Sequence, residues 1–170
     1  MPTRTIPSLH RTQPRAVVLG TNEIASAVAV HLWGEGFAVV LSHDPDRPVI
    51  RRAMAYHDIL FGEEIVLDGV PGFALERALD LVGLGAAERG IAVTTLGLVD
   101  LLPMGPFAVL VDARMNEAAA VPDLRHLAHR TIGLGPGFAV GRACDAAIDT
   151  ARRPAPDPLR LVVPRGGEPA

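Results

Sequence analysis

The sequence predicts an α/β protein with a Rossmann-like, doubly wound sheet that is mainly parallel and carries helices on both faces. Short, continuously apolar runs such as "AVVL" and "AVLV" alternate with segments of helical periodicity, which is typical of strands buried on both faces. The first of these strands is followed by a glycine turn, a helix and a second strand within roughly thirty residues, the pattern of a βαβ unit. Such a unit is parallel and right-handed.

The remaining elements follow at short intervals. The predicted strands share short apolar runs and cover residues 15–20, 37–42, 91–95, 107–113 and 130–138, the last running into a glycine-rich turn. The predicted helices share apolar residues spaced by three or four positions and cover residues 23–33, 50–61, 75–89 and 116–130. A hairpin is expected over residues 63–72, where Asp68-Gly69 marks the turn. Residues 144–150 are either a last strand or a helical turn.

The composition fits one globular domain. The chain has 170 residues, of which 49% are hydrophobic, so it can bury a sizeable core. We expect a single Rossmann-like domain over residues 15–153, between a flexible N-terminal tail, 1–14, and a proline-rich C-terminal tail, 154–170. The formal net charge of -3 gives no electrostatic argument for nucleic acid.

Several classes of chemistry are excluded by residue usage. All sixteen basic residues are arginine, which excludes a Schiff-base lysine and a P-loop lysine. The single cysteine, Cys144, allows no internal disulfide and nothing argues for secretion. The N-terminus lacks the apolar region of a signal peptide, and no apolar run approaches the length of a membrane span. We therefore expect a cytoplasmic protein without a membrane partner.

The turn after the first strand resembles a dinucleotide-binding turn with one departure. Gly20 can supply the tight turn, but Asn22 occupies the place where a second glycine would let the backbone approach a pyrophosphate. Asn22 could instead cap the following helix, so the turn serves either a phosphate-bearing ligand or the fold alone. Asp44, at the end of the second strand, is either a ribose ligand or an ordinary loop residue.

Ligands of doubly wound sheets bind beyond the carboxyl ends of the strands, which here points to residues 20–22, 43–44, 112–114 and 133–137. Arg51 and Arg52 begin the second predicted helix near that crevice and are either phosphate ligands or a solvated surface pair. The stretch "GLGPGF" offers bare backbone N–H groups either to a ligand or to another chain segment. Its three glycines are Gly133, Gly135 and Gly137.

The histidines offer weaker hypotheses. His57 lies on the apolar side of its predicted helix and is more consistent with a satisfied core residue than with a catalytic one. His126 and His129 are three positions apart on a predicted helix and could share a metal, but no third ligand has suitable spacing, so no metal site is predicted.

Taken in order, four stretches resemble a known family. They are "VVLGTNEIASAVAVHLWGEGFAVVLS", "PVIRRAMAYHDILFGE", "VLVDAR" and "IGLGPGFAVGRACDAAIDTAR". Together, over residues 15–153, they look like the selenium-dependent molybdenum hydroxylase system protein family (YqeB-like), which is related to the XdhC/CoxF maturation factors of xanthine and carbon monoxide dehydrogenases. The chain departs from the family at the first turn, where the family has a glycine run, and lacks the C-terminal region of longer members.

The resemblance implies an accessory role, in which the protein binds or hands over the molybdenum-pterin cofactor of a molybdenum hydroxylase apo-enzyme. The implied cofactor-binding residues are Gly20, Asn22, Asp44, Arg51, Arg52, Gly133, Gly135 and Gly137. Two alternatives stay open from the residues themselves. One is a nucleotide-binding, NAD(P)-dependent oxidoreductase, and the other is a non-catalytic scaffold or homo-oligomer with a degenerate nucleotide site.

Overall fold

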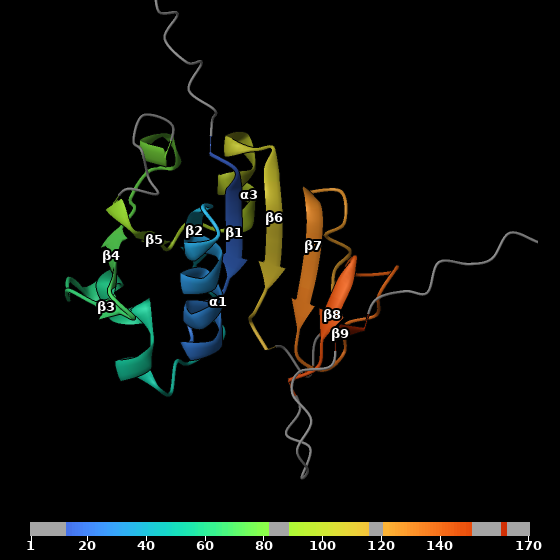
Figure 1. Ribbon diagram of the computed structural model, residues 1–170, viewed down its shortest axis with the longest axis horizontal. Helices are drawn as coiled ribbons and strands as arrows, with labels where there is room; N and C mark the ends of the chain where they lie inside the picture. Colours follow the sequence, from blue (N-terminus) through green and yellow to red (C-terminus); the bar gives the residue numbers. More distant parts are fainter. Residues whose placement is uncertain (1–12, 82–88, 116–120, 151–160, 163–170) are drawn as a thin grey trace, which may run out of the picture.

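The computed structural model describes residues 13–81, 89–115, 121–150 and 161–162. Within them the chain forms a nine-stranded sheet in the order β3-β4-β5-β2-β1-β6-β7-β8-β9 (Figure 1). The strands are β1 (Arg15–Leu19), β2 (Ala38–Ser42), β3 (Val66–Leu67), β4 (Val70–Ala74), β5 (Ile91–Thr94), β6 (Phe107–Asp112), β7 (Ala128–Leu134), β8 (Ala146–Ile148) and β9 (Leu161–Val162). The strands from β4 to β8 in this order pair in parallel, and β3 and β9 pair antiparallel at the edges.

The predicted βαβ unit is present. β1 leads through a glycine turn into α1 (Glu23–Gly34), and α1 leads into β2, which pairs with β1 in parallel from Arg15↔Ala38 to Leu19↔Ser42. The next strand beside β1 on its other side is β6. The order of the sheet therefore reverses at β1, and the switch point lies between the carboxyl ends of β1 and β6.

Two apolar layers cover the sheet, one on each face. Adjacent strand residues point to opposite faces, so Val18 packs with Ala25 and Ala29 of α1, whereas Val17 packs in a separate cluster with Leu101. The first face is covered by α1 and by the 3₁₀ segment η2 (Tyr56–Phe61); the second is covered by α3 (Leu98–Leu101) and η4 (Leu102–Met104). In Figure 1, α1 lies over β1 and β2, with α3 on the far side of the sheet. The predicted fold class is confirmed.

The prediction of one regular helix over residues 50–61 is wrong. The segment forms two 3₁₀ pieces, η1 (Arg52–Met54) and η2, separated by Ala55 in extended conformation. Two tertiary hydrogen bonds explain the break: the backbone N–H of Tyr56 donates to Ser26 Oγ at 3.0 Å, and the Tyr56 hydroxyl donates to the Val70 carbonyl at 2.8 Å. In a continuous helix the helical period would set the direction of the Tyr56 side chain, and it would point away from these partners.

The predicted helix over residues 116–130 is also wrong where the structure describes it. Residues 121–127 are not helical, and β7 begins at Ala128, which pairs with Phe107 of β6. Pro122 and a turn in which Asp123 Oδ1 accepts from the Arg125 backbone N–H disfavour a helix. His126 and His129 therefore do not lie on one helix, and the spacing on which the hypothesis of a shared metal depended is absent. Residues 116–120 lie outside the described part of the chain.

The other predicted elements are largely confirmed. The hairpin between β3 and β4 turns at Asp68-Gly69, and both of these residues have a positive φ. Residues 144–150 contain the strand β8 rather than a helical turn. Of the predicted helix over 75–89, the described residues form η3 (Ala78–Leu81) and include the α-helical residue Arg89; residues 82–88 lie outside them. β9 falls within the segment expected as a C-terminal tail, and the N-terminal tail lies outside the described residues up to position 12.

Candidate functional site at the switch point

Two cavities lie at the carboxyl ends of β1, β2 and β6, where the topology predicts a ligand site. The larger has a volume of about 300 Å³ and is lined by Gly20, Thr21, Asn22, Glu23, Ile24, Asp44, Arg47, Pro48, Val49, Ile50, Arg114 and Met115. The other has a volume of about 260 Å³ and is lined by Leu19, Ser42, His43, Asp44, Pro45, Gly97, Leu98, Arg114, Pro122 and Leu124. Asp44 and Arg114 line both cavities, so these two side chains stand at the boundary between them.

Gly20 shapes the turn between β1 and α1. Its φ of +111° is a conformation that side chains disfavour, and a Cβ there would lie 3.2 Å from the Ala113 carbonyl oxygen. Its N–H donates to the Ser42 carbonyl at 2.7 Å. The glycine thus supplies the tight turn, as the sequence predicted, and the structure shows that this turn passes close to the end of β6.

Asn22 ties the start of α1 to the end of β6. Its Oδ1 accepts from the backbone N–H groups of Ile24 and Ala25, at 3.0 and 2.9 Å, and its Nδ2 donates to the Ala113 carbonyl at 2.8 Å. The alternative reading of Asn22 as a helix cap is confirmed. Two of the N–H groups that a dinucleotide turn would offer to a pyrophosphate are therefore already occupied by a side chain.

Arg114 is the most strongly positioned cation at the boundary of the cavities. Its Nε donates to Asp112 Oδ1 at 2.9 Å and its Nη2 donates to Asp112 Oδ2 at 2.6 Å, a bidentate pair. Asp112 ends β6 and is 3% exposed. The hydrogen bonds to this carboxylate raise the pKa of Arg114 above its usual value. The pair uses Nε and Nη2, and Arg114 lines both cavities.

The backbone turns sharply directly after Arg114. Met115 has a φ of +57°, an uncommon conformation for a residue with a side chain and one that recurs at functional positions. Its sulfur accepts a weak hydrogen bond from Thr150 Oγ1 at 3.8 Å, and a Cβ at Gly135 would lie 3.2 Å from the same sulfur. Met115 thus connects the wall of the 300 Å³ cavity to the glycine-rich loop.

A cluster of three polar side chains, Thr21, His43 and His57, adjoins the two cavities, and Thr21 and His43 are among their lining residues. The Thr21 hydroxyl lies 3.2 Å from His43 Nδ1 and 2.9 Å from His57 Nδ1, and the two imidazole centroids are 5.0 Å apart. Thr21 and His57 are buried. Burial lowers the pKa of His57, and the neighbouring His43 lowers it further. His57 is thus a buried residue with a partner, as the sequence indicated, but its partners were not predicted.

The predicted site residues divide into two groups. Gly20, Asn22 and Asp44 line the 300 Å³ cavity. The other five residues do not line this cavity. Arg51 Nε lies 3.9 Å from Glu23 Oε1, and Arg52 pairs with Asp58 and lies over the Phe61 ring. The three glycines, Gly133, Gly135 and Gly137, lie at and after the end of β7. The binding role of all eight stays a prediction.

Sequence reasoning did not select Arg114, Thr21 or His43. Arg114 lay in one of the four places that the topology indicated, and the signal that could have singled it out is Asp-x-Arg at the end of a strongly apolar strand. Thr21, His43 and His57 come from three separate segments. No local spacing in the sequence relates them.

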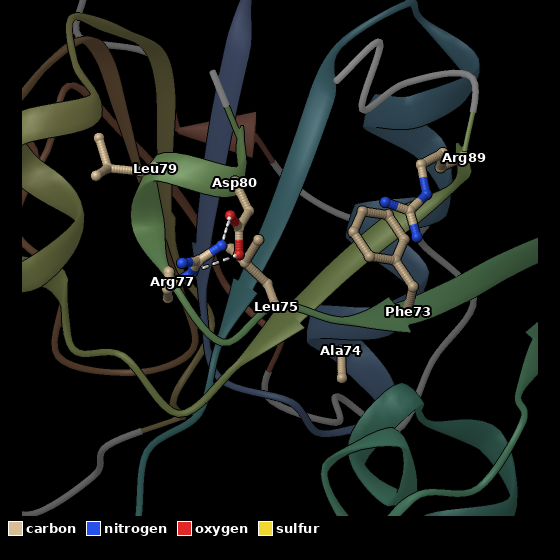
Figure 2. A pocket seen from close by; sticks show the side chains of 7 residues that line it. All are labelled: Phe73, Ala74, Leu75, Arg77, Leu79, Asp80 and Arg89. Atoms are coloured by element: carbon tan, nitrogen blue, oxygen red, sulfur yellow. Dashed lines mark hydrogen bonds and ion pairs between the residues drawn. The ribbon is translucent and has the colours of Figure 1, made fainter. Parts of the chain in front are cut away.

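A third cavity, of about 450 Å³, lies away from the switch point, beside β4 (Figure 2). Its polar groups already have partners: Arg77 pairs with Asp80, and the Arg89 guanidinium lies 4.6 Å from the centroid of the Phe73 ring. Its lining residues flank positions 82–88, which lie outside the described residues, so we assign it no binding role.

Among the described residues, no group of three or more His, Cys, Asp or Glu side chains is arranged to hold a metal ion. Within the same part of the chain, no helix has both the length and the apolar character needed to cross a membrane.

The fold and the cavities define a Rossmann-like α/β protein with a crevice at the switch point of its sheet, whose walls are mostly apolar and include a few charged side chains. The chain is 32% identical over 147 residues to a protein of Escherichia coli (strain K12) with the name "Uncharacterized protein YqeB". The match covers 86% of this chain but 26% of the relative, so the chain spans about a quarter of that protein's length. No protein-family model and no solved structure matches the chain.

Proposed function

We propose that this protein is a cytoplasmic accessory protein for a molybdenum hydroxylase of the xanthine or carbon monoxide dehydrogenase type, and that it binds or hands over the molybdenum-pterin cofactor. The similarity to YqeB agrees with the family resemblance of the sequence motifs. Because the name of that relative states no activity, the chemistry of the crevice has to carry the proposal.

The observation that carries it is the Arg114–Asp112 pair at the switch point. A guanidinium that is already held by a buried carboxylate loses little conformational freedom when it binds a second oxyanion. Arg114 faces both cavities, so an anion at their boundary would meet a planar donor. A phosphate-bearing ligand is the class that this arrangement suits.

The crevice also fits the size and polarity of such a ligand. Ligand pockets have volumes of roughly 300–1,000 Å³ and combine apolar walls with a few placed polar groups. The two cavities here, of about 300 and 260 Å³, share Asp44 and Arg114 and have Ile24, Val49 and Leu98 in their walls. In this proposal Arg114 would hold the phosphate, Asp44 would accept from an N–H or O–H group of the ligand, and the bound cofactor supplies the metal chemistry that the hydroxylase needs.

An NAD(P)-dependent oxidoreductase is the second candidate. It is favoured by Gly20 and Asp44, which line the cavity at the positions expected of a dinucleotide site. It is disfavoured by Asn22, whose side chain occupies the Ile24 and Ala25 N–H groups. We therefore rank it below the accessory role.

The rim of the crevice offers a surface for the hydroxylase apo-enzyme or for a second copy of this chain. Ile50 lines the 300 Å³ cavity and is 87% exposed, and Met54 and Phe61 follow on η1 and η2 with 60% and 67% exposure. Exposed apolar side chains close to a ligand site are frequent in protein contacts. A handover of cofactor requires such a contact beside the crevice.

The test is a titration of the purified chain with isolated molybdenum-pterin cofactor, followed by the fluorescence of the single tryptophan, Trp33, or by equilibrium dialysis. Arg114→Met should weaken binding by about tenfold or more, because a charge-assisted hydrogen bond contributes about 1.5–3 kcal/mol. NAD(H) and NADP(H) should not bind at millimolar concentration.

Arg125→Met is the matched control. Arg125 forms the same bidentate pair with Asp123 at the same i, i+2 spacing, but it lines neither of the two switch-point cavities. It should bind the cofactor as the wild type does. Equal affinity of wild type and Arg114→Met, or tight binding of NAD(P) in place of the pterin, would overturn the proposal.

A further inference from the structure

The Thr21 hydroxyl is shared by two imidazoles, which limits how the protons of the three side chains can be arranged. Both contacts are made by Nδ1 atoms, at 3.2 Å for His43 and 2.9 Å for His57. The hydroxyl has one hydrogen, so it can donate to at most one Nδ1, and at least one Nδ1 donates its N–H to the hydroxyl. When the hydroxyl donates to one imidazole, the two neutral histidines are opposite tautomers, and the Nδ1 that accepts has a lone pair that can take up a proton.

The charges around the two cavities nearly cancel when both histidines are neutral. Asp112 neutralises Arg114, and Glu23 lies beside Arg51. The remaining charged side chains in the cavity walls are Asp44 and Arg47, of opposite sign. A dianion that entered this crevice would find donors but no net positive charge. The histidine cluster is the group that can supply it within the pH range of the cell.

We propose that Thr21, His43 and His57 form a proton-accepting subsite that takes up one proton when a tetrahedral dianion, such as a phosphate group, binds in the switch-point crevice. The inference rests on the proposed function for the location of the anion beside Arg114. Thr21 lines the 300 Å³ cavity and His43 lines the 260 Å³ cavity, so the cluster reaches both sides of the shared boundary.

The hydrogen-bond arithmetic gives a second consequence. When both Nδ1 atoms carry hydrogen, both donate to the two lone pairs of Thr21 Oγ1. The hydroxyl hydrogen then has no imidazole acceptor. Thr21 belongs to the cavity wall, and the bound anion provides the oxygen acceptor that this hydrogen requires. Proton uptake and anion binding thus support each other.

The groups around the cluster set the pH at which this happens. Three groups act on His57: His43, which follows β2, Asp58 on the same segment η2, and Arg52 on η1. Asp58 favours the charged form of the His57 imidazole, whereas His43 and Arg52 disfavour it. Glu23 of α1 and Asp44 after β2 lie in the wall of the adjoining cavity, as does Arg114 after β6. In the free protein burial lowers the pKa of His57, which favours its neutral form, so in this proposal the proton arrives with the anion.

Sulfate is the suitable probe, because it stays a dianion between pH 5.5 and 8.5 and does not itself titrate there. Sulfate should bind the full-length chain at constant ionic strength with a Kd that rises by up to about tenfold per pH unit as the pH increases. Calorimetry in buffers of different ionisation enthalpy should count the uptake of up to one proton. NMR titration of the six histidines should show that sulfate raises the pKa of His57.

His43→Gln should remove the pH dependence, and Thr21→Val, which keeps the shape of the side chain, should reduce the linkage between the two imidazoles. His31→Gln is the matched control, because His31 is exposed in the last turn of α1 and should retain the wild-type slope. The NMR measurement on the wild type needs no variant, so an unstable variant does not decide the outcome.

The inference is overturned if sulfate does not bind, if its affinity is independent of pH, or if saturating sulfate leaves the pKa of His57 unchanged. Its failure is distinguishable from that of the proposed function. Proton-linked sulfate binding without affinity for the molybdenum-pterin cofactor keeps the subsite and removes the accessory role. Cofactor binding whose affinity is independent of pH would keep the accessory role and remove the subsite.

Discussion

Asn22 donates a hydrogen bond from Nδ2 to the Ala113 carbonyl, 2.8 Å away and 91 positions further along the chain. With its Oδ1 it caps α1. One side chain thus joins the start of the first helix to the end of β6, across the switch point. The place where a dinucleotide turn has a bare backbone is filled by a structural connection.

The two roles of Asn22 can be separated by two substitutions. Asn22→Ser keeps a capping oxygen but cannot donate to Ala113, and it should lower the free energy of unfolding by about 1 kcal/mol. Asn22→Ala loses both roles and should lower it by about 2 kcal/mol. Urea denaturation monitored by circular dichroism measures both values. Equal loss in the two variants would mean that the cap contributes nothing to stability, and no loss in Asn22→Ser would mean the same of the hydrogen bond to Ala113.

The fold could be predicted to the extent that it depends on local pattern. The apolar runs of β1, β2, β5 and β6 and the Asp68-Gly69 hairpin have short-range signatures, and each was predicted correctly. β7 begins at Ala128, two residues before its predicted start, because the spacing of residues 116–130 indicated a helix. Pairing with β6 and the turn around Asp123 determine the structure there, and neither is encoded in periodicity.

The candidate site was predictable in position but not in composition. The rule that ligands lie beyond the carboxyl ends of parallel strands indicated Gly20, Asn22 and Asp44, which do line a cavity. Arg114 lay in an indicated segment without being chosen. The approach of Thr21, His43 and His57 depends on how η2 packs against the β1–α1 turn, and that packing follows from tertiary contacts such as Tyr56 N–H to Ser26 Oγ.

The stability of the protein should decrease at mildly acidic pH because of His57. Its folded-state pKa is lowered from the usual value of 6.5, chiefly by burial. The neutral imidazole is therefore favoured by folding, and its contribution is fully present above the unfolded-state pKa. As the pH falls from about 6.5 towards the folded-state value, the unfolded chain takes up the proton first and the free energy of unfolding decreases.

Urea denaturation between pH 5 and 8, without sulfate or phosphate, tests this expectation. His57→Gln should be less stable at pH 8 but should lose stability less steeply on acidification than the wild type. His129→Gln is the control, since His129 is exposed on β7, and it should follow the wild-type curve. Parallel curves for wild type and His57→Gln would contradict the assignment.

Tyr56 should make the protein less stable at alkaline pH. It is fully buried, donates to the Val70 carbonyl, and burial raises its pKa to about 12. Above the unfolded-state value of about 10 the unfolded chain loses the phenolic proton while the folded chain keeps it, so stability decreases from pH 10 towards pH 12. The loss should be about 1 kcal/mol at pH 11 relative to pH 9.

This window is favourable for measurement because the chain has one tyrosine and no lysine. Tyrosinate absorbance should appear only as the protein unfolds. Cys144 titrates in the same direction, since burial raises its pKa, so the comparison is made between Cys144→Ala and Cys144→Ala/Tyr56→Phe. The double variant should show no further loss between pH 10 and 11; a normal midpoint near 10 in the folded protein would contradict the prediction.

Gly133 should be intolerant of any side chain, for a reason unrelated to ligand binding. A Cβ at this position would overlap the Phe138 ring and lie 2.8 Å from the Phe138 Cβ. Gly133→Ala should therefore lower the free energy of unfolding by about 1–3 kcal/mol, the cost of overpacking a filled site. Gly34→Ala is the contrast, because a Cβ at Gly34 meets nothing within 4 Å at the end of α1, and it should be neutral or slightly stabilising. If Gly133→Ala kept full stability and lost only affinity for the cofactor, the glycine would serve the ligand and not the packing of Phe138.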